Sequence, residues 1–259
     1  FTPQELGKDF DLESYLRLGG IPLMVSSKDP ELRLRSYVQT YLKEEIQAEA
    51  LVRNLQGFAR FLPIAGIFHG QVLNIDGLAR DAGVARTTVQ GYLEILEDTL
   101  LAFRLPAFEG RLRVKEKKHP KLYWIDPGLA RASKKQFGSV SYEERGALFE
   151  GFIVQLLRTY ASLWPDFYDE AYYWSAGSRN SGVEVDVLLA RGKELLALEI
   201  KSGEQAQEGW FKGLRAIQDL KGVSRKILVY NGQRNFSTDD KIEVFALNTF
   251  LQKLQKREI

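Results

Sequence analysis

The chain has 259 residues, of which 44% are hydrophobic and 27% are charged, a composition typical of globular proteins. It contains no cysteine, which excludes disulfides, thiolate zinc sites and cysteine nucleophiles, and its two histidines disfavour a histidine-rich metal site. The net charge of +2 is too small to indicate nucleic-acid binding, so any such signal must be local.

Apolar runs in the chain are far shorter than the roughly 20 residues that span a bilayer. No charged and then apolar leader is present. We therefore expect a cytoplasmic protein that does not enter the membrane. Because residue 1 is Phe rather than Met, we also expect this sequence to be a piece of a longer protein.

The first 68 residues have helical patterns. A helix in the stretch DLESYLRLGGIPLMV is expected to end at Gly19 and Gly20, with Pro22 just beyond. Residues 30–52 predict a longer helix, and residues 55–68 predict another that Pro63 kinks or interrupts.

Residues 74–101 contain two amphipathic helical patterns separated by Gly83 and Val84, which predicts a helix-turn-helix. The start of the second helix is where a recognition helix meets base edges. The residues expected to be exposed there are Arg86, Thr87, Thr88 and Gln90.

The next segment, residues 101–126, predicts a strand, a turn at Glu109 and Gly110, a basic strand, and a strand that ends at Asp126. A helix-turn-helix followed by such a hairpin is a winged helix. The tip is basic, and clustered Lys and Arg side chains suit backbone phosphates. Its basic residues are Arg111, Arg113, Lys115, Lys117, Lys118 and Lys121, against the single acidic residue Glu116.

A polar connector, SKKQFGSVSYEE, predicts a domain boundary near residue 140. Residues 1–139 would form the helical segment and the winged helix. Residues 140–259 predict a helix, three strands, a helix, two strands and a final helix, which indicates a mixed α/β sheet. No G-x-x-x-x-G-K-[ST] phosphate loop is present, so we expect no ATP hydrolysis by this chain.

Charged residues interrupt two apolar strands in EVDVLLARGKELLALEIK, residues 184–201. Asp186 and the Glu199-x-Lys201 pair would meet on adjacent strands. Two carboxylates there can hold Mg²⁺ (or Mn²⁺), and a lysine can orient the attacking water. Glu150, on an otherwise apolar helix face, could reach the metal or its waters.

This constellation of Glu150, Asp186, Glu199 and Lys201 resembles the PD-(D/E)XK nuclease superfamily. The segments GGIPLMV, LARDAGVARTTVQGYLEILEDTLL, KHPKLYWIDPGLA and GALFEGFIVQLL also follow the order seen in bacterial and archaeal AAA+ ATPase-like proteins. Those carry a P-loop ATPase, then a winged helix, then a PD-(D/E)XK-like domain. The resemblance implies a Mg²⁺-dependent nuclease-like fold, DNA as a partner, and an ATPase module in the full-length protein.

Two positions depart from the family pattern. Lys43-Glu44-Glu45 stands where an acidic-basic-acidic run is expected, and Ser175 follows Trp174 where a basic residue is usual. The second departure puts one phosphate contact in doubt.

Other interpretations stay open at this point. The nuclease fold can persist as a non-catalytic interaction scaffold. The charged strands can be an edge hairpin with solvated charges, and the winged helix can be the head of a transcription regulator. The sequence also leaves open DNA against RNA, and the formation of a homo-oligomer.

Overall fold

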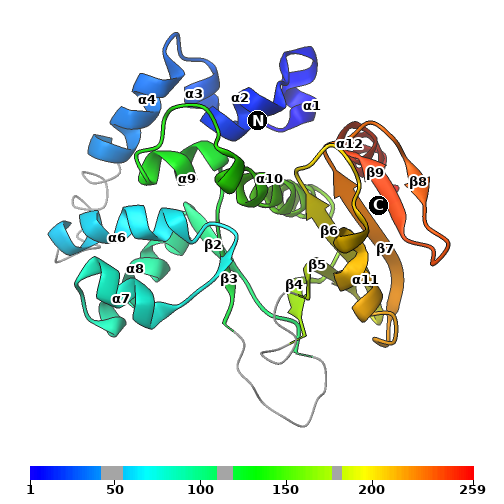
Figure 1. The fold of residues 1–259 in the computed structure, drawn as a ribbon. Helices are drawn as coiled ribbons and strands as arrows, with labels where there is room; N and C mark the ends of the chain where they lie inside the picture. Colours follow the sequence, from blue (N-terminus) through cyan, green and yellow to red (C-terminus); the bar gives the residue numbers. More distant parts are fainter. Residues whose placement is uncertain (42–54, 110–118, 177–182) are drawn as a thin grey trace. The chain divides into compact units, whose positions relative to one another are not determined.

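The computed structural model describes residues 1–41, 55–109, 119–176 and 183–259 (Figure 1). The chain divides into two compact units, the first formed by residues 1–104 and 119–155 and the second by residues 105–118 and 156–259. One contains a three-stranded sheet and the other a six-stranded sheet. The expected mixture of helices and sheets is confirmed.

Short capped helices begin the first unit. They are α1 (Pro3–Leu6), α2 (Leu12–Leu18), α3 (Pro22–Val25) and α4 (Pro30–Ser36). The predicted helix end is confirmed, because α2 stops at Leu18 and Gly19 takes a φ of +81°. The helix predicted over residues 30–52 is confirmed in its described part, where α4 continues from Tyr37 to Tyr41 as a π-helical turn, and residues 42–54 lie outside the described residues.

The next helices and strands along the chain are α6 (Leu55–Ile67), β1 (Gln71–Val72), α7 (Ile75–Ala82), α8 (Arg86–Asp98), β2 (Ala102–Leu105), β3 (Lys121–Trp124) and α9 (Pro127–Ser133). The strands pair in the order β1-β3-β2. The two helices predicted around Gly83 are confirmed, and Gly83 ends α7 in the left-handed conformation. Pro63 lies inside α6 without ending it.

The predicted basic tip lies largely outside the described residues, which resume at His119. Lys121 is described, and its assignment to an exposed tip was wrong. It is 2% exposed, on β3, because its ammonium is paired with a carboxylate of the same unit.

The connector before the helix α10 (Tyr142–Leu163) is a loop that side chains hold in place. The buried guanidinium of Arg131 donates to the carbonyl oxygens of Gly138 at 2.9 Å and Ser139 at 3.1 Å, and the ring of Phe137 is also buried. The sequence places a boundary before α10, near residue 140, whereas the compact units divide within this helix at residue 155.

The second unit is built on a mixed sheet in the order β4-β5-β6-β7-β9-β8, with β6, β7 and β9 parallel. The strands are β4 (Glu170–Ser175), β5 (Glu184–Arg191), β6 (Glu194–Lys201), β7 (Val223–Tyr230), β8 (Phe236–Ser237) and β9 (Glu243–Ala246). The predicted order of helices and strands is confirmed, and β8 is an addition. The helix predicted over residues 208–221 is shorter, a 3₁₀ turn (Glu208–Phe211) followed by α11 (Lys212–Ala216).

Helices cover both faces of this sheet (Figure 1). Leu214 of α11 packs on the face that Val185, Leu228 and Val244 share. The helix α12 (Leu247–Gln255) lies on the opposite face, because its Lys253 ammonium contacts the ring of Phe245, the neighbour of Val244 on β9. The two carboxylates of the central strands, Asp186 and Glu199, are buried, and Glu199 lies against α11.

Two buried titratable groups of the first unit depart from their usual pKa values. His69 Nδ1 accepts the backbone N–H of Trp124 at 3.0 Å, and burial lowers the pKa of His69 from 6.5 to about 3. Asp126 caps α9, accepting from Leu129 N at 3.1 Å and from Gly20 N at 2.7 Å, and burial raises its pKa from 3.8 to about 6. Their effects on stability oppose each other as pH falls.

The Asp126→Asn variant is expected to separate these effects. Below about pH 6 the folded protein protonates Asp126 before the unfolded chain does, so its contribution to the free energy of unfolding rises between pH 6 and pH 3.8. His69 titrates identically in both proteins and cancels in the difference. The wild type should therefore gain on the variant by up to about 1.4 kcal/mol per pH unit in that window. Denaturant unfolding at pH 7, 6, 5 and 4 measures it, and a difference independent of pH would contradict the assignment.

Candidate functional site

Asp186 and Glu199 lie on the adjacent strands β5 and β6. The antiparallel register pairs Val187 with Leu198, which are their neighbours in the sequence. Their exposed fractions are only 1% and 5%. Both carboxylates contact the ammonium of Lys201, so they lie close together on adjacent strands.

A β-bulge lies at Asp186. On β4, Tyr172 pairs with Leu188 and Trp174 pairs with Val185, so Tyr173 faces two residues of β5 instead of one. The Asp186 Oδ2 atom accepts the backbone N–H of Ile200 at 2.8 Å. Bulges alter the direction of a side chain within a strand, and the carboxylate of Asp186 reaches the backbone near the end of β6.

Lys201 joins the two carboxylates. Its Nζ atom lies 3.4 Å from Asp186 Oδ2 and 2.5 Å from Glu199 Oε1. The lysine side chain is 30% exposed, whereas both carboxylates are buried, so the ammonium lies on the solvent side of the cluster. Lys201 is therefore a counter-ion to both buried carboxylates.

Gly213 of α11 brings the helix backbone against this cluster. A Cβ atom at this position would lie 1.8 Å from the carbonyl oxygen of Glu184 and 3.2 Å from Glu199 Oε2. Only a glycine permits that approach. Sequence reasoning missed this residue, and its signal was a glycine inside the helical stretch EGWFKGLRA.

Glu150 has partners within the first unit. Its Oε1 atom lies 3.0 Å from Lys121 Nζ and also accepts the hydroxyl hydrogen of Tyr123. The Lys121 side chain is 3% exposed, so each charge has a buried counter-ion. Glu150 belongs to the first unit and the three strand residues to the second. Its role near the metal stays a prediction.

The residues proposed for base contacts lie at the start of α8. Arg86, Thr87 and Gln90 are exposed and Thr88 is half-buried. The Arg86 guanidinium donates to Asp76 at 2.9 and 3.0 Å. The other predicted nucleic-acid contacts, Arg111, Arg113, Lys115, Lys117 and Lys118, lie outside the described residues.

The donor set fits one hydrated ion. Within residues 1–41, 55–109, 119–176 and 183–259, no group of three His, Cys, Asp or Glu side chains is arranged to hold a metal. Mg²⁺, however, keeps several waters and is commonly bound through only one or two protein carboxylates. Asp186 and Glu199 would supply those oxygens, and the ammonium of Lys201 would have to move aside from Glu199.

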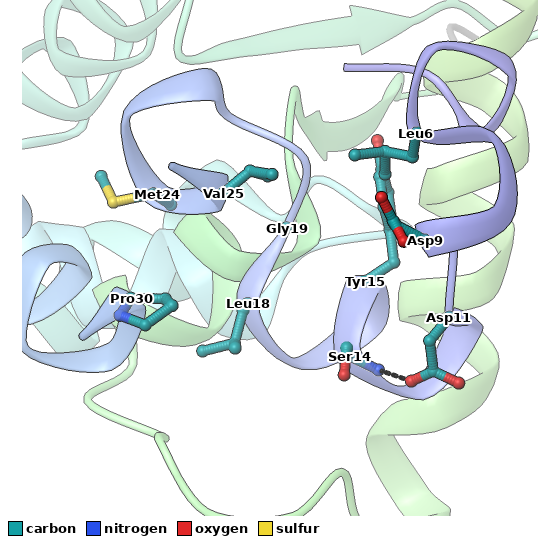
Figure 2. Close-up of a pocket in the computed structure, with 10 residues that line it drawn as sticks. All are labelled: Leu6, Asp9, Asp11, Ser14, Tyr15, Leu18, Gly19, Met24, Val25 and Pro30. Atoms are coloured by element: carbon teal, nitrogen blue, oxygen red, sulfur yellow. Dashed lines mark hydrogen bonds between the residues drawn. The ribbon is translucent and has the colours of Figure 1, made fainter. Parts of the chain in front are cut away.

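A hollow lies in the first unit, among α1, α2 and α3 (Figure 2). Most of its wall is apolar, with Leu6, Leu18, Met24 and Val25 among the lining residues. The Asp11 carboxylate at its edge accepts the backbone N–H of Ser14 at 2.8 Å and so caps α2. Two carboxylates, Asp9 and Asp11, are among the lining residues of this hollow.

Residues 9–139 match the model of a family described as a domain of unknown function, DUF8612, over just over half of the chain. The chain belongs to this family. Beyond the DUF8612 region, residues 145–250 match a second model, the domain of unknown function DUF4143. The two matches leave residues 140–144 between them, beside the boundary predicted from the sequence.

Two curated relatives are the uncharacterized protein Mb2031c of Mycobacterium bovis and the uncharacterized protein Rv2008c of Mycobacterium tuberculosis. Each is 25% identical over 248 residues, which cover 93% of this chain and 54% of the relative. The chain thus spans about half the length of the curated relatives it matches. No solved structure matches it. Among the helices of the described residues, none is both long and apolar enough to cross a membrane.

Proposed function

We propose that the second unit is a Mg²⁺- or Mn²⁺-dependent nuclease-like domain that hydrolyses phosphodiester bonds. The observation that carries the proposal is the contact of one lysine ammonium with two buried carboxylates on the central strands: Lys201 with Asp186 and Glu199. Unneutralised carboxylates cost several kcal/mol to bury, and a metal-dependent site gives them a reason to be there. The mixed sheet with a helix on each face supports a PD-(D/E)XK fold.

Each of the three residues has a distinct part in this proposal. Asp186 and Glu199 hold the ion, which when bound supplies activation of water and neutralisation of charge on the phosphate. Lys201, on the solvent side of the carboxylates, donates to a phosphate oxygen or orients the attacking water. Because a protonated lysine is not a metal ligand, Lys201 assists the reaction without occupying the ion's coordination sites.

The first unit supports the proposal of a winged helix that binds DNA. Its elements follow the order α6, β1, α7, α8, β2 and β3, which is that of a helix-turn-helix with an adjoining small sheet. The start of α8 exposes Arg86, Thr87 and Gln90. An ATPase module elsewhere in the full-length protein is a further proposed partner, on the resemblance described above and the greater length of the relatives.

Replacing Lys115, Lys117 and Lys118 together by Ala is expected to weaken DNA binding equally for all sequences. Each DNA phosphate that the variant no longer neutralises should reduce the steepness of log affinity against log salt by about 0.9 for duplex DNA. Binding isotherms at four salt concentrations measure that slope. If the slope of log affinity against log salt is unchanged, these three lysines do not contact DNA.

A non-catalytic scaffold is the alternative, and the pairing of Glu150 favours it. Its carboxylate is engaged by Lys121 and Tyr123 in the first unit, whereas Lys201 contacts Asp186 and Glu199 in the second. In that case Lys201 would serve only as a counter-ion to Asp186 and Glu199.

Digestion of a mixed panel of single-stranded and duplex DNA and RNA separates the two functions. Cleavage should require Mg²⁺ or Mn²⁺ and should disappear with EDTA and in the Asp186→Asn variant. If no substrate is cut under any metal condition by a folded wild-type protein, the scaffold function replaces the nuclease.

A further inference from the structure

A groove beside the carboxylate cluster has the composition of a nucleotide-binding surface. It is lined by Trp174, Ala176, Val183, Lys212, Arg215 and Ala216, all in the second unit. Trp174 is half-buried and packs against the same hydrophobic cluster as Leu214 of α11. The groove therefore lies on the face of the sheet that α11 covers. It is close to the carboxylate cluster, because Gly213, which lies against Glu199, is the neighbour of Lys212.

Lys212 is the available cation of this groove. Its side chain is exposed, and its ammonium makes no ion pair or hydrogen bond within the part of the chain that the structure describes. Arg215 already has two acidic partners. Its Nε atom donates to Asp240 at 2.8 Å, and its Nη1 atom donates to Glu208. These two carboxylates raise the pKa of Arg215 through their hydrogen bonds. A ligand phosphate would thus meet Lys212.

We propose that the Trp174–Lys212 groove binds one unpaired nucleotide of a nucleic-acid strand, with the base on the indole of Trp174 and its phosphate on Lys212. Aromatic side chains next to cations are the usual means of holding single strands without sequence preference. The inference rests on the proposed nuclease function, because it names what that site would hold. In this proposal Lys212 makes the phosphate contact that is in doubt because Ser175 stands in place of a basic residue.

Photo-crosslinking in EDTA tests the groove separately from cleavage. A short single strand carrying 5-iodouracil should crosslink to the wild-type chain, and mass spectrometry should find the adduct on the peptide that contains Trp174. A blunt duplex with the same base paired should give little adduct at that peptide. Because no metal is present, the result does not depend on nuclease activity.

Variants assign the two contacts. Lys212→Gln should lower the yield of the Trp174 adduct severalfold and reduce the salt slope of single-strand binding by about 0.7. Trp174→Leu should weaken binding about tenfold, with circular dichroism to confirm that it folds. The matched control is Lys193→Gln, an exposed lysine in the turn between β5 and β6, at the far end of both strands from Asp186 and Glu199.

The outcomes are distinct for the groove and for the nuclease. An adduct at Trp174 that Lys212→Gln weakens and Lys193→Gln does not would support the groove, even where no cleavage occurs in any metal. Absence of that adduct, or an equal loss of adduct yield in the two lysine variants, would contradict nucleotide binding in this groove, even where the wild type cuts nucleic acid.

Discussion

Replacing Asp186 by Asn is expected to lower metal-dependent cleavage by at least about 100-fold. The substitution removes one of the two negative charges that would hold the ion, while its size is unchanged. Its amide oxygen can still accept the backbone N–H of Ile200, which Asp186 Oδ2 now does at 2.8 Å. The bulge in β5 should therefore persist, and the loss should be of chemistry rather than of fold.

Two comparisons make this result specific. Glu194→Gln removes an exposed carboxylate at the other end of β6 and should leave cleavage unchanged. Lys201→Ala should lose cleavage yet keep metal affinity, because it removes a competing cation from Asp186 and Glu199. Activities measured at saturating Mn²⁺, with thermal unfolding as the folding check, would contradict the account if Asp186→Asn matched the wild type.

The Gly213→Ala variant is expected to destabilise the second unit by about 3 kcal/mol. The new methyl group would lie 1.8 Å from the Glu184 carbonyl oxygen, so either α11 or β5 has to move. Alanine in place of glycine normally stabilises a helix by up to about 1 kcal/mol, so the sign itself is informative. The shift should also disturb Glu199, whose Oε2 atom lies 3.2 Å from the same position.

Gly209 provides the control for this prediction. It precedes α11 by three residues, and a Cβ atom there would meet nothing within 4 Å. Gly209→Ala should therefore change the free energy of unfolding by less than about 0.5 kcal/mol. Denaturant unfolding of both variants, followed by circular dichroism, measures the difference. Equal stabilities would mean that α11 does not pack closely on β5 in solution.

Local patterns predicted the hairpin and its charged residues correctly. Alternation within strands has a strict period of two, so Glu199 and Lys201 had to share a face, and the short turn after Arg191 placed the strands of Asp186 and Glu199 side by side. The bulge at Asp186 was not predictable, because it depends on how β4 pairs with β5 and no local residue signals it.

Interactions distant in sequence account for the other differences. Lys121 was grouped with the basic tip by its neighbours, yet it is buried because Glu150, 29 residues later, neutralises it. Pro63 remains within a continuous α6, although a proline removes one backbone donor from a helix. Gly213 was overlooked because the strand it touches lies far from it in the sequence.

Titration of Mn²⁺ into the wild type and into Asp186→Asn, followed by isothermal calorimetry, tests the central claim most directly. The carboxylates of Asp186 and Glu199 both contact the Lys201 ammonium, so they lie close enough to share one ion. We expect a single binding event in the wild type, its loss in Asp186→Asn and its retention in Lys201→Ala. Identical titrations of the wild type and Asp186→Asn would contradict a metal site at these carboxylates.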